Sequence, residues 1–180
     1  MERTPIGTAI IRDATARDIA AMQDIEVDAG GRFAEAGLPQ IAADPPPTAA
    51  ELSPYVRSGT AWIAIDESRQ PMGYALGSVV DDHAHLDQVS VARRAQGLGV
   101  GRALIERVAR WGNHHGLGAI TLTTFRDIPF NGPLYAHLGF SELAPDEWGP
   151  ELAAIRAAER SAGLDLAPRI AMRRVISLQP

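Results

Sequence analysis

Three glycines, Gly97, Gly99 and Gly101, alternate with other residues shortly after the Val-Ser-Val run 89–91. Strand periodicity precedes them and helical periodicity follows them. Such a junction exposes several backbone N–H groups and the positive end of a helix dipole, with no side chains in the way. The segment is therefore a candidate site for a phosphate or a pyrophosphate.

Two other phosphate-binding motifs do not fit this segment. A Walker loop requires Gly-Lys-Ser/Thr, and the chain contains no lysine. A Rossmann fingerprint requires Gly-x-Gly-x-x-Gly, and Arg102 stands where its third glycine belongs. The spacing therefore argues against a protein that binds ATP or NAD through this loop.

Polar residues alternate along the preceding strand, at His83, His85 and Asp87. Alternation places them on one face of that strand. Histidine titrates in a range useful for proton transfer, so His85 is a candidate base, and Asp87 is a candidate that acts through a water. The His-x-His-x-Asp spacing also suits zinc, but the chain has no cysteine and offers no fourth ligand nearby, so we expect no metal.

Two motifs together resemble the GCN5-related N-acetyltransferase (GNAT) superfamily over about residues 60–142. One is Arg-x-x-Gly-x-Gly, with Arg94, Gly97 and Gly99 after a Val-x-Val strand. The other runs from Asn131 through Tyr135 to Gly139-Phe140, one predicted strand further on. Pro133 departs from the pattern and is tolerated only in the first turn of a helix.

The resemblance implies that the glycine segment binds the pyrophosphate of acetyl-coenzyme A, which is the expected co-substrate. It implies that Tyr135 is the general acid, a role that suits a phenol because it stays protonated at neutral pH while the departing thiolate is only moderately basic. It also implies a backbone N–H near Val89 for the oxyanion. The cofactor-binding set it gives is Val89, Ser90, Val91, Arg94, Gln96, Gly97, Leu98, Gly99, Val100, Gly101, Arg102, Asn131 and Tyr135.

The role of Asn131 has two interpretations, a hydrogen bond to the pantetheine arm or a cap on the short helix that follows. Arg93, Arg94 and Arg102 flank the glycines as candidate counter-charges for phosphates, and Arg93 is equally interpreted as a solvated surface charge.

The elements that must position these residues follow from hydrophobic periodicity and from turn residues. Thr15 is expected to cap the first helix and Gly30-Gly31 to end it, Thr48 to cap the second, and Gly139 to end the fourth. We expect strands at 8–12, 60–66, 71–80, 84–91, 119–124, 140–143 and 169–176, and helices at 15–28, 49–57, 101–115, 130–138 and 147–162.

This order predicts one α/β (α+β) domain over residues 1–180. With the resemblance, the expected architecture is a GNAT-like three-layer domain, with a mixed and mostly antiparallel central sheet flanked by helices and core motifs at 60–142.

Charge and composition exclude several classes of protein. The 180 residues carry 17 basic side chains, all arginine, against 22 acidic ones, for a net charge of −5. No clustered basic face indicates nucleic-acid binding. No apolar run approaches the ~20 residues of a membrane span and no signal peptide is evident, so we expect a cytoplasmic protein without a membrane partner.

The predicted function is an acetyl-CoA-dependent N-acetyltransferase that moves an acetyl group to a primary amine of a small molecule or a peptide. The amine attacks the thioester directly. The alternative is a non-catalytic acyl-CoA-binding module of the same fold. A homodimer is expected because dimers are common in the superfamily.

The acceptor region is expected after the first strand and near the last strands. Its acids favour a cationic amine by attraction, although the same acids are typical of a solvated helix face. The acceptor region so defined contains Asp24, Glu26, Asp28, Arg32, Phe33, Glu35, Asp146, Glu147 and Trp148.

Overall fold

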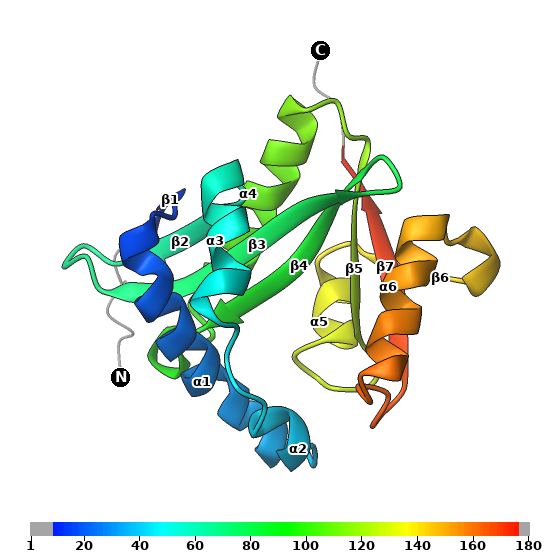
Figure 1. The fold of residues 1–180 in the computed structure, drawn as a ribbon, viewed down its shortest axis with the longest axis horizontal. Coiled ribbons are helices and arrows are strands. Elements are labelled where there is room, and N and C mark those ends of the chain that lie inside the picture. The colour runs from blue at the N-terminus through cyan, green and yellow to red at the C-terminus, as the bar shows by residue number, and fades with distance from the viewer. Residues whose placement is uncertain (1–8, 177–180) are drawn as a thin grey trace. The chain divides into compact units, whose positions relative to one another are not determined.

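The computed structural model describes residues 9–176, which divide into two compact units (Figure 1). Unit 1 holds the chain up to Leu76 together with Gln88–Arg107, and unit 2 holds Gly77–Asp87 and the chain from Val108 onward. Strands β3 (Pro71–Val80) and β4 (His83–Val91) contribute residues to both. Seven strands flanked by helices form a mixed and mostly antiparallel sheet, which confirms the predicted fold class. The single domain stays a prediction.

Unit 1 contains four neighbouring strands in the order β1-β2-β3-β4. The first two, β1 (Ile10–Asp13) and β2 (Ala61–Ile65), pair antiparallel, and β2 pairs antiparallel with β3. The predicted first strand began at Thr8, which lies outside the described residues. Unit 1 also holds α1 (Ile19–Glu35), α2 (Pro39–Ala42), α3 (Ala49–Ser58) and the start of α4 (Val100–His114).

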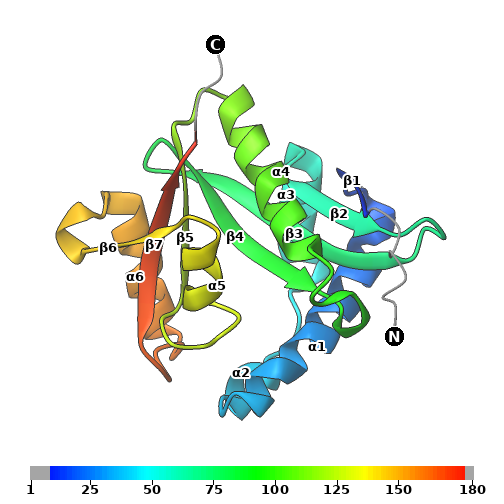
Figure 2. The same cartoon turned by 180° about the vertical axis from the view of Figure 1, so that it is seen from behind.

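Helices cover both faces of the strands in unit 1 (Figures 1 and 2). Alternate residues of β2 explain this, because successive side chains of a strand point to opposite faces. Ile63 and its neighbours Ala61 and Ile65 join the buried cluster that α1 and α3 cover. Trp62 points the other way, where the guanidinium of Arg107 on α4 lies 5.2 Å from its ring centre.

Helix α1 runs through Gly30-Gly31, where we predicted its end, so that prediction was wrong. A glycine inside a helix costs only about 1 kcal/mol relative to alanine, which packing can offset. A side chain at position 31 would lie 3.0 Å from the guanidinium of Arg93. The glycine at position 31 therefore allows the Arg93 guanidinium to lie close to α1. The helix ends instead before Gly37, which has a φ of 84°.

Both predicted threonine caps begin helical segments. Thr48 forms a capping box with Glu51: its N–H donates to the Glu51 carboxylate (2.7 Å) and its hydroxyl oxygen accepts from the Glu51 N–H (3.3 Å). Thr15 precedes one turn of 3₁₀ helix, η1 (Ala16–Asp18), and its N–H and hydroxyl both donate to the Asp18 carboxylate. The α-helical hydrogen bonds of α1 start only after that turn.

Unit 2 contains the strand order β4-β5-β7-β6. β5 pairs in parallel with β4 at Ala84 and His85, and β7 pairs antiparallel with both β5 and β6. Helices α5 and α6 lie on opposite faces of these strands (Figures 1 and 2). The elements are β5 (Ala119–Phe125), α5 (Gly132–His137), β6 (Ser141–Leu143), η3 (Pro145–Glu147), α6 (Pro150–Ser161) and β7 (Arg169–Val175).

The helix predicted at 147–162 begins later, because the turn between β3 and β4 caps it. The Asp81 carboxylate accepts from the N–H groups of Glu151 (3.0 Å) and Leu152 (2.9 Å), and Asp81 is itself left-handed, with a φ of 48°. A side chain at Gly149 would overlap that carboxylate. The chain therefore stays extended at Trp148 and Gly149, and α6 starts where Asp81 satisfies its first amides.

A buried ionic network fastens α6 to the strands of unit 2. Arg156, 4% exposed, forms an ion pair with Glu159. Glu159 also accepts from Arg169 on β7 (2.8 Å) and from the hydroxyl of Thr123 on β5. Within residues 9–176, no helix has the length and apolar character needed to cross a membrane.

The first turn of α4 packs directly on β3, and we predict that Gly73→Ala destabilises the protein. An alanine Cβ would lie 2.8 Å from the carbonyl oxygen of Ser90 and within 3.3 Å of Val100 and Leu104. Overpacking of this kind costs about 1–3 kcal/mol, measurable by chemical denaturation. Gly118→Ala is the control, because its Cβ would meet nothing within 4 Å. Equal stability of the two variants would contradict the prediction.

Candidate functional site

The glycine segment forms an open loop between β4 and α4 in unit 1. A short 3₁₀ turn, η2 (Arg93–Ala95), leads into it, an element that the sequence did not indicate. Gly97 and Gly99 are both left-handed, with φ of 76° and 81°, and an added Cβ at either would meet nothing within 4 Å. The loop therefore presents bare backbone beside the N-terminus of α4, as an anion site requires.

The side chains of Arg93 and Arg94, in the turn before the glycines, bind residues outside the loop. The Arg94 guanidinium donates to the Pro71 carbonyl (2.7 Å) and pairs with Asp66 (3.3 Å). The Arg93 guanidinium pairs with Glu35, and its backbone N–H donates to Asp28 (2.6 Å). Both arginine side chains thus have protein partners, and the backbone amides and the exposed Arg102 are further donors for an anion.

The other residues predicted to bind the cofactor in unit 1 differ in exposure. Gln96 donates from its side chain to the Val91 carbonyl (3.1 Å), which closes the turn before the glycines. Leu98 is 41% exposed, whereas Val100 is 2% exposed and packs in the core. Val89, Val91 and Gly101 are partly buried. The loop surface thus consists of backbone and of one apolar side chain.

Ser90 takes part in a polar cluster that the sequence did not reveal. Its hydroxyl donates to the carboxylate of Glu26 on α1 (2.5 Å), and the same carboxylate accepts from Tyr74 on β3 and from Gln88 on β4. The residues are 48 to 64 positions from Glu26 in sequence, so no local pattern could have joined them.

His85 is buried in unit 2, with 3% of its surface exposed. Its Nδ1 lies 2.8 Å from the hydroxyl oxygen of Thr121 on β5. Burial lowers the pKa of His85 to about 4 from its usual 6.5, although the charges of Glu159 and Asp81 oppose this shift. The ring is therefore neutral at pH 7. Its burial and its partner favour a structural role, and its role as a base stays a prediction.

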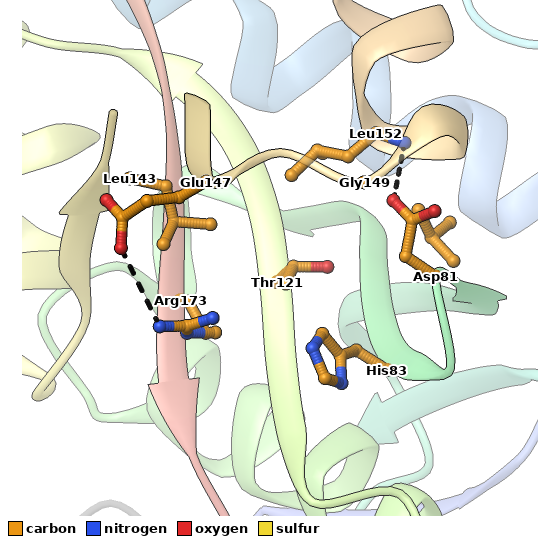
Figure 3. A pocket seen from close by; sticks show the side chains of 9 residues that line it. Asp81, His83, Thr121, Leu143, Glu147, Gly149, Leu152 and Arg173 are labelled. Atoms are coloured by element: carbon orange, nitrogen blue, oxygen red, sulfur yellow. Dashed lines mark hydrogen bonds and ion pairs between the residues drawn. The ribbon is translucent and has the colours of Figure 1, made fainter. Parts of the chain in front are cut away.

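His83 lines a pocket of about 240 Å³ in unit 2 (Figure 3). Its Nδ1 is buried and has no hydrogen-bond partner in the described chain. Thr121, Glu147 and Arg173 line the same pocket, and Figure 3 shows Arg173 facing Glu147, 4.0 Å away. Asp87, by contrast, is exposed on β4. Among residues 9–176, no group of three or more His, Cys, Asp or Glu side chains is arranged to hold a metal ion.

Asn131 and Tyr135 lie at the start and in the middle of α5. Asn131 occupies the N-cap position, but its side chain makes no capping hydrogen bond, and its Oδ1 is buried without a partner in the described chain. A side chain at Gly132 would overlap the Arg126 carbonyl, which explains the glycine there. Pro133 stands in the first turn, where it is tolerated.

Tyr135 is 8% exposed and packs edge-to-face on Phe140, with ring centres 5.7 Å apart. Burial raises the pKa of Tyr135 to about 12, so its hydroxyl keeps its proton through the neutral range. The predicted residues thus fall into two groups: the glycine loop, Val89, Ser90 and Val91 in unit 1, and His85, Asp87, Asn131 and Tyr135 in unit 2.

Residues 33–140, more than half of the chain, match the Acetyltransferase (GNAT) family. The chain belongs to this family. The matched segment contains the left-handed glycines of the loop and Tyr135, so the two motifs that carried the resemblance lie inside it. Glu26 lies outside it.

Solved structures share this GNAT fold at low sequence identity. They include N-acetylglutamate synthase from Neisseria gonorrhoeae in complex with coenzyme A and N-acetyl-glutamate (TM-score 0.69, 18% identity, 94% of this chain). This chain spans 35% of the length of that synthase.

Two further structures match over most of both chains. The ribosomal-protein-S18-alanine N-acetyltransferase from Escherichia coli has a TM-score of 0.66 at 19% identity, over 96% of this chain and 97% of its own. A phosphinothricin acetyltransferase from Sinorhizobium meliloti, in complex with AcCoA, has a TM-score of 0.64 at 18% identity, over 94% and 89%. At these identities the likeness establishes the fold alone.

The buried His85 of this GNAT protein predicts a pH-dependent stability. Its pKa is lower in the folded chain than in the unfolded chain, so below pH 6.5 the unfolded chain takes up a proton that the folded chain refuses until about pH 4. Stability therefore falls as the pH drops through this window. Between about pH 7.5 and 5, the wild type should lose roughly 2 kcal/mol more than His85→Asn in chemical denaturation. Parallel pH profiles of the two proteins would contradict the shift.

Proposed function

We propose that this protein transfers the acetyl group of acetyl-CoA to a primary amine of a small molecule or a peptide. The observation that carries the proposal is the open pair of left-handed glycines at the start of α4, in a chain of the GNAT family. Bare amides at a helix N-terminus suit the pyrophosphate of the coenzyme. The complexes of related folds with coenzyme A or AcCoA support the choice of co-substrate.

Asn131 is the proposed contact for the pantetheine arm. A buried amide oxygen without a partner is costly unless a ligand satisfies it. The pantetheine arm carries amide N–H groups that would donate to this Oδ1. The absence of a capping bond from Asn131 within the described chain supports this role over the capping role.

The chemistry we propose needs an oxyanion donor, an acid and a base. The amine nitrogen forms a bond to the thioester carbon while the backbone N–H near Val89 stabilises the oxygen, and the carbon–sulfur bond then breaks as Tyr135 protonates the sulfur. His85 and Asp87 are the candidate bases from the sequence. The Tyr135 hydroxyl is protonated when the thiolate departs, as the acid role requires, although burial raises its pKa and makes it a weaker proton donor.

The alternative proposal is an acyl-CoA-binding module without catalysis, and thiol release separates the two. The assay measures free coenzyme A from acetyl-CoA across polyamines, aminoglycosides, amino acids and short peptides. Because the chain contains no cysteine, a thiol reagent detects no background from the protein. Release stimulated by an amine supports the enzyme and names its acceptor class. Tight acetyl-CoA binding with no release supports the module.

We keep a homodimer and a cytoplasmic location as parts of the proposal. Light scattering of the purified chain measures the first, and fractionation of cells that express it measures the second.

Gly99→Glu should abolish acetyl-CoA binding, because it places a carboxylate where a phosphate would sit. Calorimetric titration with acetyl-CoA checks this, with an expected loss of affinity of at least about 100-fold. Gly163→Glu is the matched control: that glycine is also left-handed (φ 76°), and an added Cβ there also meets nothing within 4 Å. Unchanged affinity of Gly99→Glu would remove the loop from the site.

Tyr135→Phe should leave acetyl-CoA binding intact and lower kcat by about 100-fold, because only the acidic hydroxyl is lost. The thiol-release assay measures kcat, and Tyr55→Phe on α3 serves as the control for the same chemical change. A kcat equal to that of the wild type at every pH would refute the acid role.

A further inference from the structure

The carboxylate of Glu26 is the centre of the polar cluster in unit 1. It accepts hydrogen bonds from the Tyr74 hydroxyl (2.7 Å), the Ser90 hydroxyl (2.5 Å) and the Gln88 amide (2.9 and 3.1 Å). The donors come from β3 and β4, and Glu26 comes from α1, so packing of α1 on these strands fixes its position. The Gln88 amide also donates to Ser90 (3.0 Å), which ties the two strand donors together.

All of these partners are neutral. Burial, with the Glu26 charge and hydrogen bond, raises the pKa of Tyr74, so its hydroxyl keeps its proton. In the described part of the chain, no arginine forms an ion pair with Glu26. Asp18 and Glu159, which are also partly buried, each pair with an arginine. Among the described residues, the Glu26 carboxylate thus has hydrogen-bond donors but no ion-pair partner, and it remains partly exposed to solvent.

The position of Glu26 relates this charge to the reacting group. Gln88 and Ser90 flank Val89, whose N–H is the proposed oxyanion donor. Side chains two residues apart on a strand point to the same face, and the Glu26 carboxylate accepts from both Gln88 and Ser90. An amine that attacks a carbonyl held at Val89 from this face would meet the Glu26 carboxylate.

We propose that Glu26 receives the protonated amine of the acceptor and takes its proton before attack. This inference rests on the proposed function. A primary amine is a cation at neutral pH, and an uncompensated, partly exposed carboxylate attracts it. Of the candidate bases, His85 is buried against Thr121. Glu26, on α1, is partly exposed and accepts hydrogen bonds from Gln88 and Ser90, which flank the proposed oxyanion donor.

The protons balance along this route. One proton passes from the ammonium to Glu26, which frees the lone pair that forms the carbon–nitrogen bond. When the carbon–sulfur bond breaks, the sulfur takes up one proton and the nitrogen gives up its second proton. Glu26 then releases its proton to water, so the products are an acetylated amine, coenzyme A and one proton.

Glu26→Gln tests the proposal, because the amide keeps an oxygen that accepts hydrogen bonds but loses the charge and the basicity. With the amine of the panel that the wild type uses fastest, kcat/KM should fall about 100-fold. Acetyl-CoA affinity and the thermal unfolding midpoint should be unchanged. Hydroxylamine is an uncharged nucleophile at neutral pH, so the thiol release that it stimulates should be the same in both proteins. Glu67→Gln, an exposed carboxylate in the turn before β3, is the control for lost charge.

Two results would overturn the assignment of Glu26. One is an unchanged kcat/KM for the amine, and the other is an equal loss with the amine and with hydroxylamine, which would indicate a purely structural role. A wild type that releases no thiol with any amine is a different result: it overturns the proposed function, and this inference with it.

Discussion

The first turn of α4 lies directly on the strands of unit 1 because Gly73 has no side chain. Val100 and Leu104 occupy the space that a Cβ at position 73 would need, and the Ser90 carbonyl closes it from β4. This contact fixes where α4 begins, and therefore where the left-handed Gly97 and Gly99 lie beside its N-terminus. A backbone anion site has no side chains of its own to adjust, so its geometry depends on how the helix is seated.

Asp66 and Glu159 differ from Glu26 in whether an arginine pairs with the carboxylate. Arg94 forms an ion pair with Asp66 at the base of the glycine loop, and Arg169 forms an ion pair with Glu159 beneath α6. Burying a carboxylate is tolerable when a guanidinium supplies both charge and directed donors. Glu26 departs from this arrangement because, among the described residues, only neutral groups donate hydrogen bonds to its carboxylate.

Local signals in the sequence predicted the order of the elements and the glycine loop. Strand and helix periodicity placed all seven strands within two residues of their observed ends, and the two threonines begin helical segments as expected. Features set by long-range contacts could not be predicted. Gly31 was interpreted as a helix end because its partner, Arg93, lies far along the chain, and the start of α6 depends on Asp81 in a distant turn.

The same limit applies to the site. Tyr135 and Asn131 were found through a motif, but only the structure shows that the Asn131 oxygen is buried without a partner in the described chain. Histidine chemistry suggested His85, and burial, which sequence does not report, lowers its basicity. The sequence placed Glu26 only among the acids of the expected acceptor region. It could not give the partners of Glu26, because the cluster joins α1 to strands about fifty or more residues away.

Every cation in the ion pairs described above is a guanidinium, and none of the 180 residues is a lysine. Acetyl-CoA is an activated thioester that reacts with amines. The ion pairs that hold this fold together contain no lysine ε-amine with which it could react. Self-acetylation of lysine, which would remove its charge and release its carboxylate partner, has no target among these 180 residues. The arginine ion pairs at the glycine loop and beneath α6 would therefore keep their charge at any concentration of acetyl-CoA.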